Sequence, residues 1–369
     1  MSTRVVVAMS GGVDSSVVAA LLAEQGCEVV GVMLRLWAGG WSEETPAGNR
    51  CCSIDAVEDA RRVADQCGFP FYLINAEDEF KRHVVDYFLA EYATGRTPNP
   101  CTACNHHIKF DFLLRRALGL EADYLASGHY ARLRHRPDGT VELLRAVDEA
   151  KDQSYMLYML GQERLRRLMF PLGELTKAQV RSEAERLHLP VAHKPESQDI
   201  CFVGKDYRDF LAQHIPEAIV PGQLVNTAGA VVGAHRGLPL HTVGQRAGLN
   251  VLPSPVTAGE DQGEGTRRQP PRTYVVGMDA ETNRIVVGHE PDLFRTTLRV
   301  RDPAFNLEPR AGAALAAKIR SHGQLASCRI ERYGAELNVS FAEPQRAVSP
   351  GQIIVFYDGD VVVGGGIID

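Results

Sequence analysis

The sequence contains no uninterrupted apolar run of about eighteen residues, the length that a membrane-spanning helix requires. It also lacks the pattern of a signal peptide, because the apolar residues near its start are broken by the polar stretch Ser10–Ser16. We therefore expect a cytoplasmic protein without a membrane segment. The chain has 369 residues, of which 44% are hydrophobic, and is longer than one hydrophobic core usually accommodates, so two or three folded domains are expected.

A surplus of positive charge is absent as well. The chain has 40 Lys and Arg against 46 Asp and Glu, which gives a formal net charge of −6. This balance argues mildly against a nucleic-acid partner, although such affinity depends on where Lys and Arg gather rather than on net charge. We find no internal repeats in the sequence.

The eight cysteines do not pair by spacing into a disulfide framework. In a cytoplasmic protein, cysteines are more often catalytic, metal-binding or buried than cross-linked. Three of them lie in strand-like runs or at the end of a predicted helix and are expected in the core: Cys27, Cys67 and Cys328. The remaining five are candidates for chemistry: Cys51, Cys52, Cys101, Cys104 and Cys201.

The chain does have a glycine-rich turn between a predicted strand and a predicted helix. The apolar run Val5–Met9 predicts a buried strand, Val17–Glu24 predicts a helix, and Ser10–Ser16 (SGGVDSS) joins them. Glycines leave room for an anion, and the free amides of a first helical turn point toward it, so this arrangement predicts a phosphate site. No Lys follows the glycines, which excludes a GxxxxGK[ST] loop. Asp14 would repel a triphosphate that lacks Mg²⁺, so the motif indicates chemistry at an α-phosphate.

Strands and helices alternate up to about residue 203. This order predicts an α/β domain with a doubly wound parallel sheet, whose ligands bind at the carboxyl ends of the strands. The further strands are expected at Cys27–Met33, Phe71–Asn75 and Tyr124–Ala126, and the further helices at Ile54–Cys67, Glu77–Thr94, from Asn105 onward, and Thr176–Leu187. A loop-like stretch is expected over residues 35–50. Lys151–Tyr155 is expected to open another, amphipathic helix.

Two segments place cysteines next to polar residues. The loop Gly95–Asn105 contains two prolines, and the helix predicted from Asn105 would put Cys104 at a helix N-terminus, where the helix dipole favours a thiolate. Cys201 follows a polar string, and beside Cys104 it becomes the second member of a two-cysteine site. His129 follows Gly128 at the carboxyl end of a predicted strand, so a structural role and a role in the ligand crevice are both open for it.

Beyond residue 204 the pattern changes to short alternating strands separated by glycines. Two further domains are expected: a small β-rich middle domain over 204–294 and a C-terminal β-barrel over 295–369. The middle domain is expected to begin with a last helix at Asp206–Ile215. The middle strands are expected at Val231–Gly233, His241–Arg246, Tyr274–Gly277 and Arg284–Gly288, with a mobile loop at Ser254–Arg272. The barrel strands are expected at Leu298–Val300, Ala316–Arg320, Cys328–Ile330, Leu337–Phe341, Ile353–Tyr357 and Val361–Ile368.

The SGGVDSS string resembles the pyrophosphate loop of the PP-loop ATPases, which activate an oxygen by adenylation. From Ser10 to Asp369 the chain resembles the tRNA-specific 2-thiouridylases, which thiolate the wobble uridine of certain tRNAs. The strings that carry the resemblance are, in order, SGGVDSS, CCS, RTPNPC..CN..IKF, SGHYAR, KDQSYMLY, SQDICFV, HTVGQR.GL and PGQ..VFY...VVGGGII. It implies a PP-loop ATP-binding catalytic domain at 1–203, ATP and Mg²⁺ as cofactors, and a monomer. It also implies two partners, the tRNA and a sulfur-relay or cysteine desulfurase protein.

The resemblance also implies roles for single residues. Cys201 would receive a persulfide sulfur, and Cys104, as the other catalytic cysteine, would form a disulfide bond with it when the sulfur leaves. ATP contacts are implied for Ala8, Met9, Ser10, Gly11, Gly12, Val13, Asp14, Ser15, Leu34 and Gly128. Contacts with the target base or the rest of the tRNA are implied for Asn99, Pro100, Cys101, His129, Lys151, Asp152, Gln153, Arg320, Ser321 and Gln352.

Several alternatives stay open. Some family members have an aspartate, credited with acid-base help, where Cys101 stands. Cys101, Cys104 and Cys201 could instead hold a [4Fe–4S] cluster, or the Cys101-x-x-Cys104 pair could form half a zinc site with Cys51 and Cys52. We favour a persulfide relay without a metal. The competing functions are an ATP-dependent amidating ligase, which would survive loss of Cys104 and Cys201, and a non-catalytic tRNA- or metal-binding protein.

Overall fold

The computed structural model describes residues 2–37, 53–196, 200–203, 206–249, 251, 272–309, 314–333 and 336–369. Its first sheet has five strands in the order β3-β2-β1-β4-β7, and every neighbouring pair is parallel. The strands are β1 (Arg4–Ala8), β2 (Glu28–Arg35), β3 (Phe71–Asn75), β4 (Tyr124–Ser127) and β7 (Leu168–Met169). The doubly wound parallel sheet is therefore confirmed.

Both faces of this sheet are covered, as its apolar strands require. Val5 and Val7 of β1 pack into one core with the first group of helices, whereas Val6 packs into a second core on the opposite face. The first group comprises α1 (Val13–Glu24), α2 (Ile54–Cys67) and α8 (Lys177–Arg186). The predicted ends of α2 are correct, because the Ser53 Oγ accepts a hydrogen bond from the Ala56 amide and Gly68 ends the helix with φ 75°.

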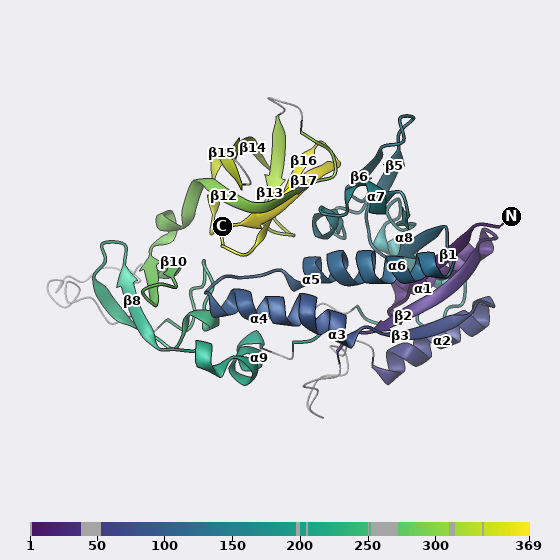
Figure 1. Ribbon diagram of the computed structural model, residues 1–369, viewed down its shortest axis with the longest axis horizontal. Helices are drawn as coiled ribbons and strands as arrows, with labels where there is room; N and C mark the ends of the chain where they lie inside the picture. The colour runs from purple at the N-terminus through teal and green to yellow at the C-terminus, as the bar shows by residue number, and fades with distance from the viewer. Residues whose placement is uncertain are drawn as a thin grey trace, which may run out of the picture.

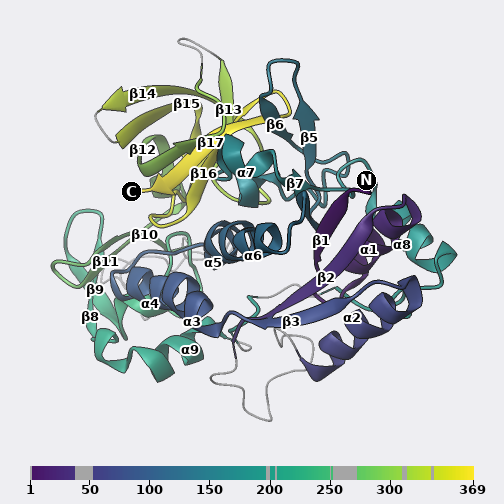
Figure 2. The ribbon, with the colours of Figure 1, turned by 45° about the vertical axis from the view of Figure 1, so that its right-hand side comes forward.

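Two long helical segments form the second core and lie side by side below the C-terminal strands (Figures 1 and 2). The first segment consists of α3 (Glu77–Phe80), the π-helical turn η2 (Lys81–Val85) and α4 (Asp86–Ala93). The second consists of α5 (Pro100–Ala103), the π-helical stretch η3 (Cys104–Phe112) and α6 (Leu113–Gly119). Phe88 and Phe110 are fully buried and anchor one segment each.

The remaining helical elements have three to five residues each, except for α9, which has eight. They are η4 (Ser154–Leu157), α7 (Gly161–Leu165), α9 (Tyr207–His214), η5 (Pro216–Ala218), η6 (Leu238–Leu240) and η8 (Glu290–Leu293). The predicted amphipathic helix that opens at Lys151 is thus wrong, since only the 3₁₀ turn η4 forms there. The carboxylate of Asp152 accepts hydrogen bonds from the amides of Ala146 and Ser154, which holds the chain in a turn.

The second sheet has four strands in the order β10-β11-β8-β9. They are β8 (Gly222–Asn226), β9 (Val231–His235), β10 (Tyr274–Asp279) and β11 (Arg284–Gly288). The predicted strand His241–Arg246 is wrong, because this segment folds into turns in which Gly244 has φ 90°. The predicted loop Ser254–Arg272 lies outside the described residues except for Arg272, and most of the 35–50 stretch, together with Cys51 and Cys52, also lies outside them.

The third sheet closes into a six-stranded antiparallel barrel, which confirms the predicted barrel. Its order is β12-β15-β14-β13-β16-β17, and β12 also pairs with β17. The strands are β12 (Phe294–Phe305), β13 (Leu315–Lys318), β14 (Ala326–Tyr333), β15 (Glu336–Arg346), β16 (Ile353–Asp358) and β17 (Val361–Ile368). The sequence did not predict the hairpin of β5 (Arg132–His135) and β6 (Val141–Leu144), which extends this sheet by pairing β6 with β17.

Polar contacts fix the barrel to the loop that follows α4. The Thr97 amide donates to the Pro350 carbonyl oxygen at 2.8 Å, and Gln352 Nε2 donates to the Thr97 carbonyl oxygen at 2.8 Å. Close by, both carboxylate oxygens of Glu91 lie 2.8 Å from the guanidinium of Arg301. The loop that leads into α5 is therefore positioned by the C-terminal strands.

Among the described residues, no helix combines the length and the apolar character needed to cross a membrane.

Candidate functional site

The loop between β1 and α1 is held in shape by its own hydroxyl groups. Ser15 Oγ accepts a hydrogen bond from the Ser10 amide at 3.1 Å, and Ser16 Oγ donates to the Gly12 carbonyl oxygen at 2.8 Å. Gly11 has φ 69°, and a Cβ atom there would lie 2.2 Å from the Ala56 carbonyl oxygen. Gly12 caps α1 without a side chain, so no side chain of the cap covers the amides of the first turn.

The carboxyl end of β4 connects this loop to the rest of the site. A Cβ atom on Gly128 would lie 2.9 Å from the Ser15 amide nitrogen, so the loop packs directly on this strand end. The next residue, His129, is buried, with its Nδ1 2.9 Å from Ser127 Oγ and its ring 5.4 Å from that of Phe110. Tyr130 then donates its hydroxyl to Asp14 at 2.9 Å. Gly128, His129 and Tyr130 thus contact the phosphate loop, the helix η3 and Asp14, respectively.

The cysteine-bearing helix begins earlier than predicted. Asn99 is its N-cap and accepts a hydrogen bond from the Thr102 amide at 3.2 Å, and Pro100 takes the first helical position. The prediction that Cys104 lies at the helix N-terminus is therefore wrong. Cys101 lies in the first turn and Cys104 in the second, where the helix dipole has largely faded.

Cys101 and Cys201 lie close enough to influence each other. Cys101 is exposed, yet desolvation by the surrounding protein raises the pKa of its thiol, the charge of Cys201 raises it further, and the ammonium of Lys109 lowers it. Cys201 is half-buried and packs against the apolar core that contains Cys104. Among the described residues, no disulfide bond joins Cys101, Cys104 and Cys201. The structure thus brings the two predicted catalytic cysteines to one core, next to Cys101.

The residues of this site do not fit a metal cluster. Within the described ranges, no three side chains of His, Cys, Asp or Glu are arranged to hold a metal ion, and this includes Cys101, Cys104 and Cys201. Cys51 and Cys52, the other half of the alternative zinc site, lie outside these ranges. We therefore derive no chemistry from an iron–sulfur cluster.

Most residues predicted to contact tRNA gather around Thr97 and the carboxyl end of β4. Gln352 binds the Thr97 carbonyl oxygen, and Gln153 Oε1 accepts a hydrogen bond from the Tyr130 amide at 3.0 Å. Arg320 is exposed and donates to the Ala347 carbonyl oxygen at 2.6 Å, and Ser321 follows it half-buried. Asn99, Pro100 and Cys101 begin the neighbouring helix.

Asp152 and Lys151, which were also predicted to contact tRNA, form ion pairs with other side chains of the protein. The carboxylate of Asp152 is 1% exposed and lies within 4 Å of Arg145 and of Lys318 from the barrel. It therefore faces the protein rather than the solvent and fixes the turn that presents Gln153. Lys151 forms an ion pair of 2.7 Å with Glu196.

Residues 3–205 match the family model of the "tRNA methyl transferase HUP domain", 208–289 that of the "tRNA methyl transferase PRC-barrel domain", and 295–368 that of the "Aminomethyltransferase beta-barrel domain". A "tRNA-specific 2-thiouridylase MnmA" of Roseiflexus castenholzii is 48% identical over 384 residues, which cover 99% of each chain. The chain belongs to the tRNA-specific 2-thiouridylase family. This confirms the resemblance drawn from the sequence motifs.

A second 2-thiouridylase, from Carboxydothermus hydrogenoformans, is 48% identical over 374 residues, which cover 99% of this chain and 97% of the relative. Among solved structures, the chain is similar to a 4-thiouridine synthetase in complex with RNA and ATP. That match has 15% identity, covers 58% of this chain and 51% of that chain, and has a TM-score of 0.32.

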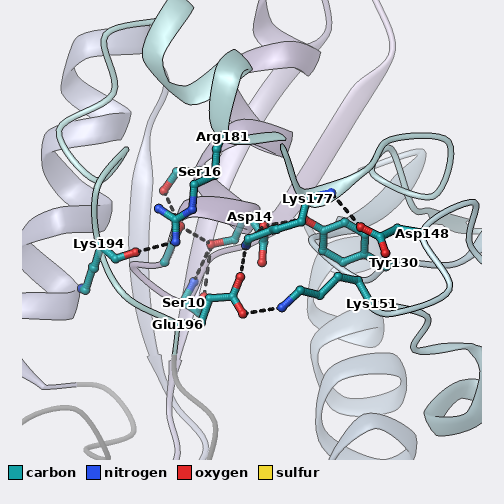
Figure 3. A network of polar contacts seen from close by, with 12 residues as sticks. Ser10, Asp14, Ser16, Tyr130, Asp148, Lys151, Lys177, Arg181, Lys194 and Glu196 are labelled. Carbon is teal, nitrogen blue, oxygen red and sulfur yellow. Dashed lines mark hydrogen bonds and ion pairs between the residues drawn. The ribbon is translucent and has the colours of Figure 1, made fainter. Parts of the chain in front are cut away.

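Sequence reasoning missed the basic residues around the phosphate loop. Lys177, the first residue of α8, lies 2.7 Å from Asp14 (Figure 3). Lys194 Nζ lies 2.9 Å from the Gly11 carbonyl oxygen. Glu196 joins Lys177 to Lys151. The available signal was topological: α8 follows β7 at the edge of the sheet, so its N-terminus belongs at the carboxyl end of the strands.

Buried histidines predict how the stability of the protein depends on pH. Burial, helped by neighbouring positive charge, lowers the pKa values of His106 and His241 to about 4, and burial together with Lys109 lowers that of His129. These histidines therefore bind protons near pH 6.5 in the unfolded chain but stay neutral in the folded chain at that pH. The free energy of unfolding should fall as the pH is lowered from about 6.5 toward 4.

Urea unfolding between pH 7 and pH 5 checks this expectation. A His241→Gln variant should show a shallower decline, by up to about 1.4 kcal/mol per pH unit for the lost proton. Exposed His135 provides the matched control, and His135→Gln should leave the decline as in the wild type. A wild-type stability that stays flat or rises between pH 7 and pH 5 would contradict the prediction.

Proposed function

We propose that this protein is a tRNA-uridine 2-sulfurtransferase that uses ATP to replace the C2 oxygen of the wobble uridine by sulfur. The single observation that carries the proposal is the strand end Gly128–Tyr130, which contacts the phosphate loop on one side and the cysteine-bearing helix on the other. An activated oxygen and a sulfur carrier can therefore meet in one place. The names of the relatives, all tRNA-specific 2-thiouridylases, support the substrate.

The first step activates the base. The uracil C2 oxygen attacks the α-phosphorus of ATP·Mg²⁺, the bond from that phosphorus to the bridging oxygen breaks, and pyrophosphate leaves while N3 loses its proton. In this step the uncapped amides of α1 and the hydroxyl of Ser10 would bind phosphate oxygens. A wobble base is unpaired in the free anticodon loop, so turning it out of the stack costs less than opening a base pair.

The second step transfers sulfur. The terminal sulfur of a Cys201 persulfide attacks C2, and AMP leaves with the former C2 oxygen. The Cys104 thiolate then attacks Sγ of Cys201, which breaks the bond to the transferred sulfur and leaves a thiocarbonyl on the base. The two cysteines end as a disulfide bond, and two electrons from an external dithiol restore them. The persulfide sulfur itself comes from a sulfur-relay or cysteine desulfurase protein.

Cys101 and His129 line the path of the base in this proposal. Because burial and Lys109 lower the pKa of His129, its imidazole is neutral at pH 7 and offers a ring face rather than a charge. Cys101 is exposed in the first turn of α5 and lies close enough to Cys201 for the charge of one thiol to act on the other. Its raised pKa disfavours a thiolate, so a neutral thiol contacts the base.

The test is an anaerobic reaction of the purified protein with ATP·Mg²⁺, a tRNA with a wobble uridine, and a persulfide donor. We expect 2-thiouridine at the wobble position by mass spectrometry of nucleosides, together with AMP and pyrophosphate. Product that forms with ammonia and without sulfur would favour the amidating ligase. Absence of both products and of pyrophosphate release would contradict an enzyme of this class.

A further inference from the structure

Four charged side chains form an alternating row beside the phosphate loop (Figure 3). Lys177 Nζ lies 2.7 Å from Asp14 Oδ1 and 2.7 Å from Glu196 Oε1, and Glu196 Oε2 lies 2.7 Å from Lys151 Nζ. The row is held from outside: the Tyr130 hydroxyl binds Asp14, and the Asp148 carboxylate accepts a hydrogen bond from the Lys177 amide at 2.9 Å. Lys177 is the least accessible member, with 14% of its side chain exposed.

The row lies on a definite side of the loop. In the order β3-β2-β1-β4-β7, Leu34 is the penultimate residue of β2, whereas Tyr130 follows β4 and Lys177 opens the helix after β7. Since β1 lies between β2 and β4, the row and Leu34 are on opposite sides of the loop. The strand order reverses at β1 and β4, which is where α/β proteins bind ligands. A nucleotide that contacts Leu34 through its base, in keeping with the ATP contact that the resemblance implies for this residue, would therefore extend its terminal phosphates toward the lysines.

The charges of the row balance one another in the absence of a nucleotide. Burial alone would raise the pKa of Glu196, but the hydrogen bonds from Lys151 and Lys177 outweigh it and bring the pKa to about 2, so the carboxylate is charged at neutral pH. Lys177 borders the loop through Asp14, as Lys194 does through the Gly11 carbonyl oxygen, and Lys151 follows behind Glu196. Because a carboxylate and a phosphate oxygen bind an ammonium group in the same way, one can replace the other.

We propose that Lys177 and Lys151 bind the β- and γ-phosphates of ATP and then the pyrophosphate, and that Glu196 occupies this place until the nucleotide arrives. When the bond between the α-phosphorus and the bridging oxygen breaks, its electron pair passes to the β-phosphate, and Lys177 meets the charge that develops there. The lysine that the sequence lacks after its glycines is thus supplied from α8. The inference rests on the proposed function, because it names the residues that bind pyrophosphate, the leaving group of the proposed reaction.

Binding measurements test the inference without tRNA or sulfur. The dissociation constants of ATP·Mg²⁺, pyrophosphate and AMP are measured by equilibrium dialysis for the wild type, Lys177→Met and Glu196→Gln. Lys177→Met should weaken ATP and pyrophosphate by about 10-fold to 100-fold and leave AMP unchanged. Glu196→Gln should tighten ATP by about twofold to fivefold, because it removes the competing carboxylate.

Lys81→Met is the matched control, because Lys81 forms an ion pair of the same 2.7 Å with Asp86 on a helix surface. It should bind all three ligands as the wild type does, and thermal unfolding verifies that each variant is folded. The inference is overturned if Lys177→Met weakens AMP as much as ATP, or if Glu196→Gln weakens ATP. It also fails, together with the proposed function, if the wild type binds no ATP. Lysine-dependent ATP binding without thiolation would instead sink only the proposed function.

Discussion

Replacing Cys201 by Ala is expected to lower the formation of 2-thiouridine at least about a thousandfold while pyrophosphate release with tRNA continues. Activation of the C2 oxygen uses the phosphate loop, whereas sulfur transfer needs the thiol that carries the persulfide. Cys104→Ala should give the same loss, because no thiolate remains to break the bond between Cys201 and the transferred sulfur. The two variants therefore separate the two steps of the proposed reaction.

The measurement is a time course of nucleosides and pyrophosphate under anaerobic conditions. Cys67→Ala is the matched control, since Cys67 is a half-buried free thiol at the end of α2, away from the cysteine-bearing helix. It should thiolate tRNA at the wild-type rate. If Cys201→Ala thiolates normally with a persulfide donor, the relay through this residue is wrong.

The second large effect is expected at the phosphate loop. Gly11→Ala should abolish ATP binding, with a loss of at least about 100-fold, because a methyl group would lie 2.2 Å from the Ala56 carbonyl oxygen and the backbone there has φ 69°. The loop must move away from α2 to make room, and its hydroxyl contacts are lost with it. Isothermal titration with ATP·Mg²⁺ measures the loss directly.

Gly68 is the control that separates backbone strain from the steric clash with Ala56. It has φ 75°, nearly that of Gly11, but a Cβ atom there meets nothing within 4 Å. Gly68→Ala should therefore lower the free energy of unfolding by about 1 to 2 kcal/mol through backbone strain alone and bind ATP as before. Equal ATP affinity in Gly11→Ala and Gly68→Ala would show that the close approach to Ala56 does not shape the site.

Local signals made part of this molecule predictable. The strand, glycine loop and helix at the start of the chain are adjacent in sequence, so their hydrogen bonds can be anticipated from residue types alone. The same holds for α2, which begins at a Ser cap and ends at Gly68. The barrel strands were predictable because their apolar residues alternate and point into one core.

Errors arose where a distant or competing partner decided the structure. Pro98 and Pro100 predicted a loop, but Pro100 fits the first position of a helix whose cap is Asn99, which moved the helix start ahead of both cysteines. Asp152 bonds to backbone amides, so a turn replaced the expected helix. The contact of Lys177 with Asp14 joins residues 163 positions apart, and no local sequence pattern predicts it.

The β5–β6 hairpin has a consequence for how the chain is made on the ribosome. Leu144 of β6 pairs with Val361 of β17, so the hairpin leaves the ribosome more than 200 residues before its partner strand exists. Throughout that interval its edge carries unpaired amides and carbonyls that can pair with another chain. Nascent chains stalled before β17 should therefore need protection from aggregation that the finished protein does not.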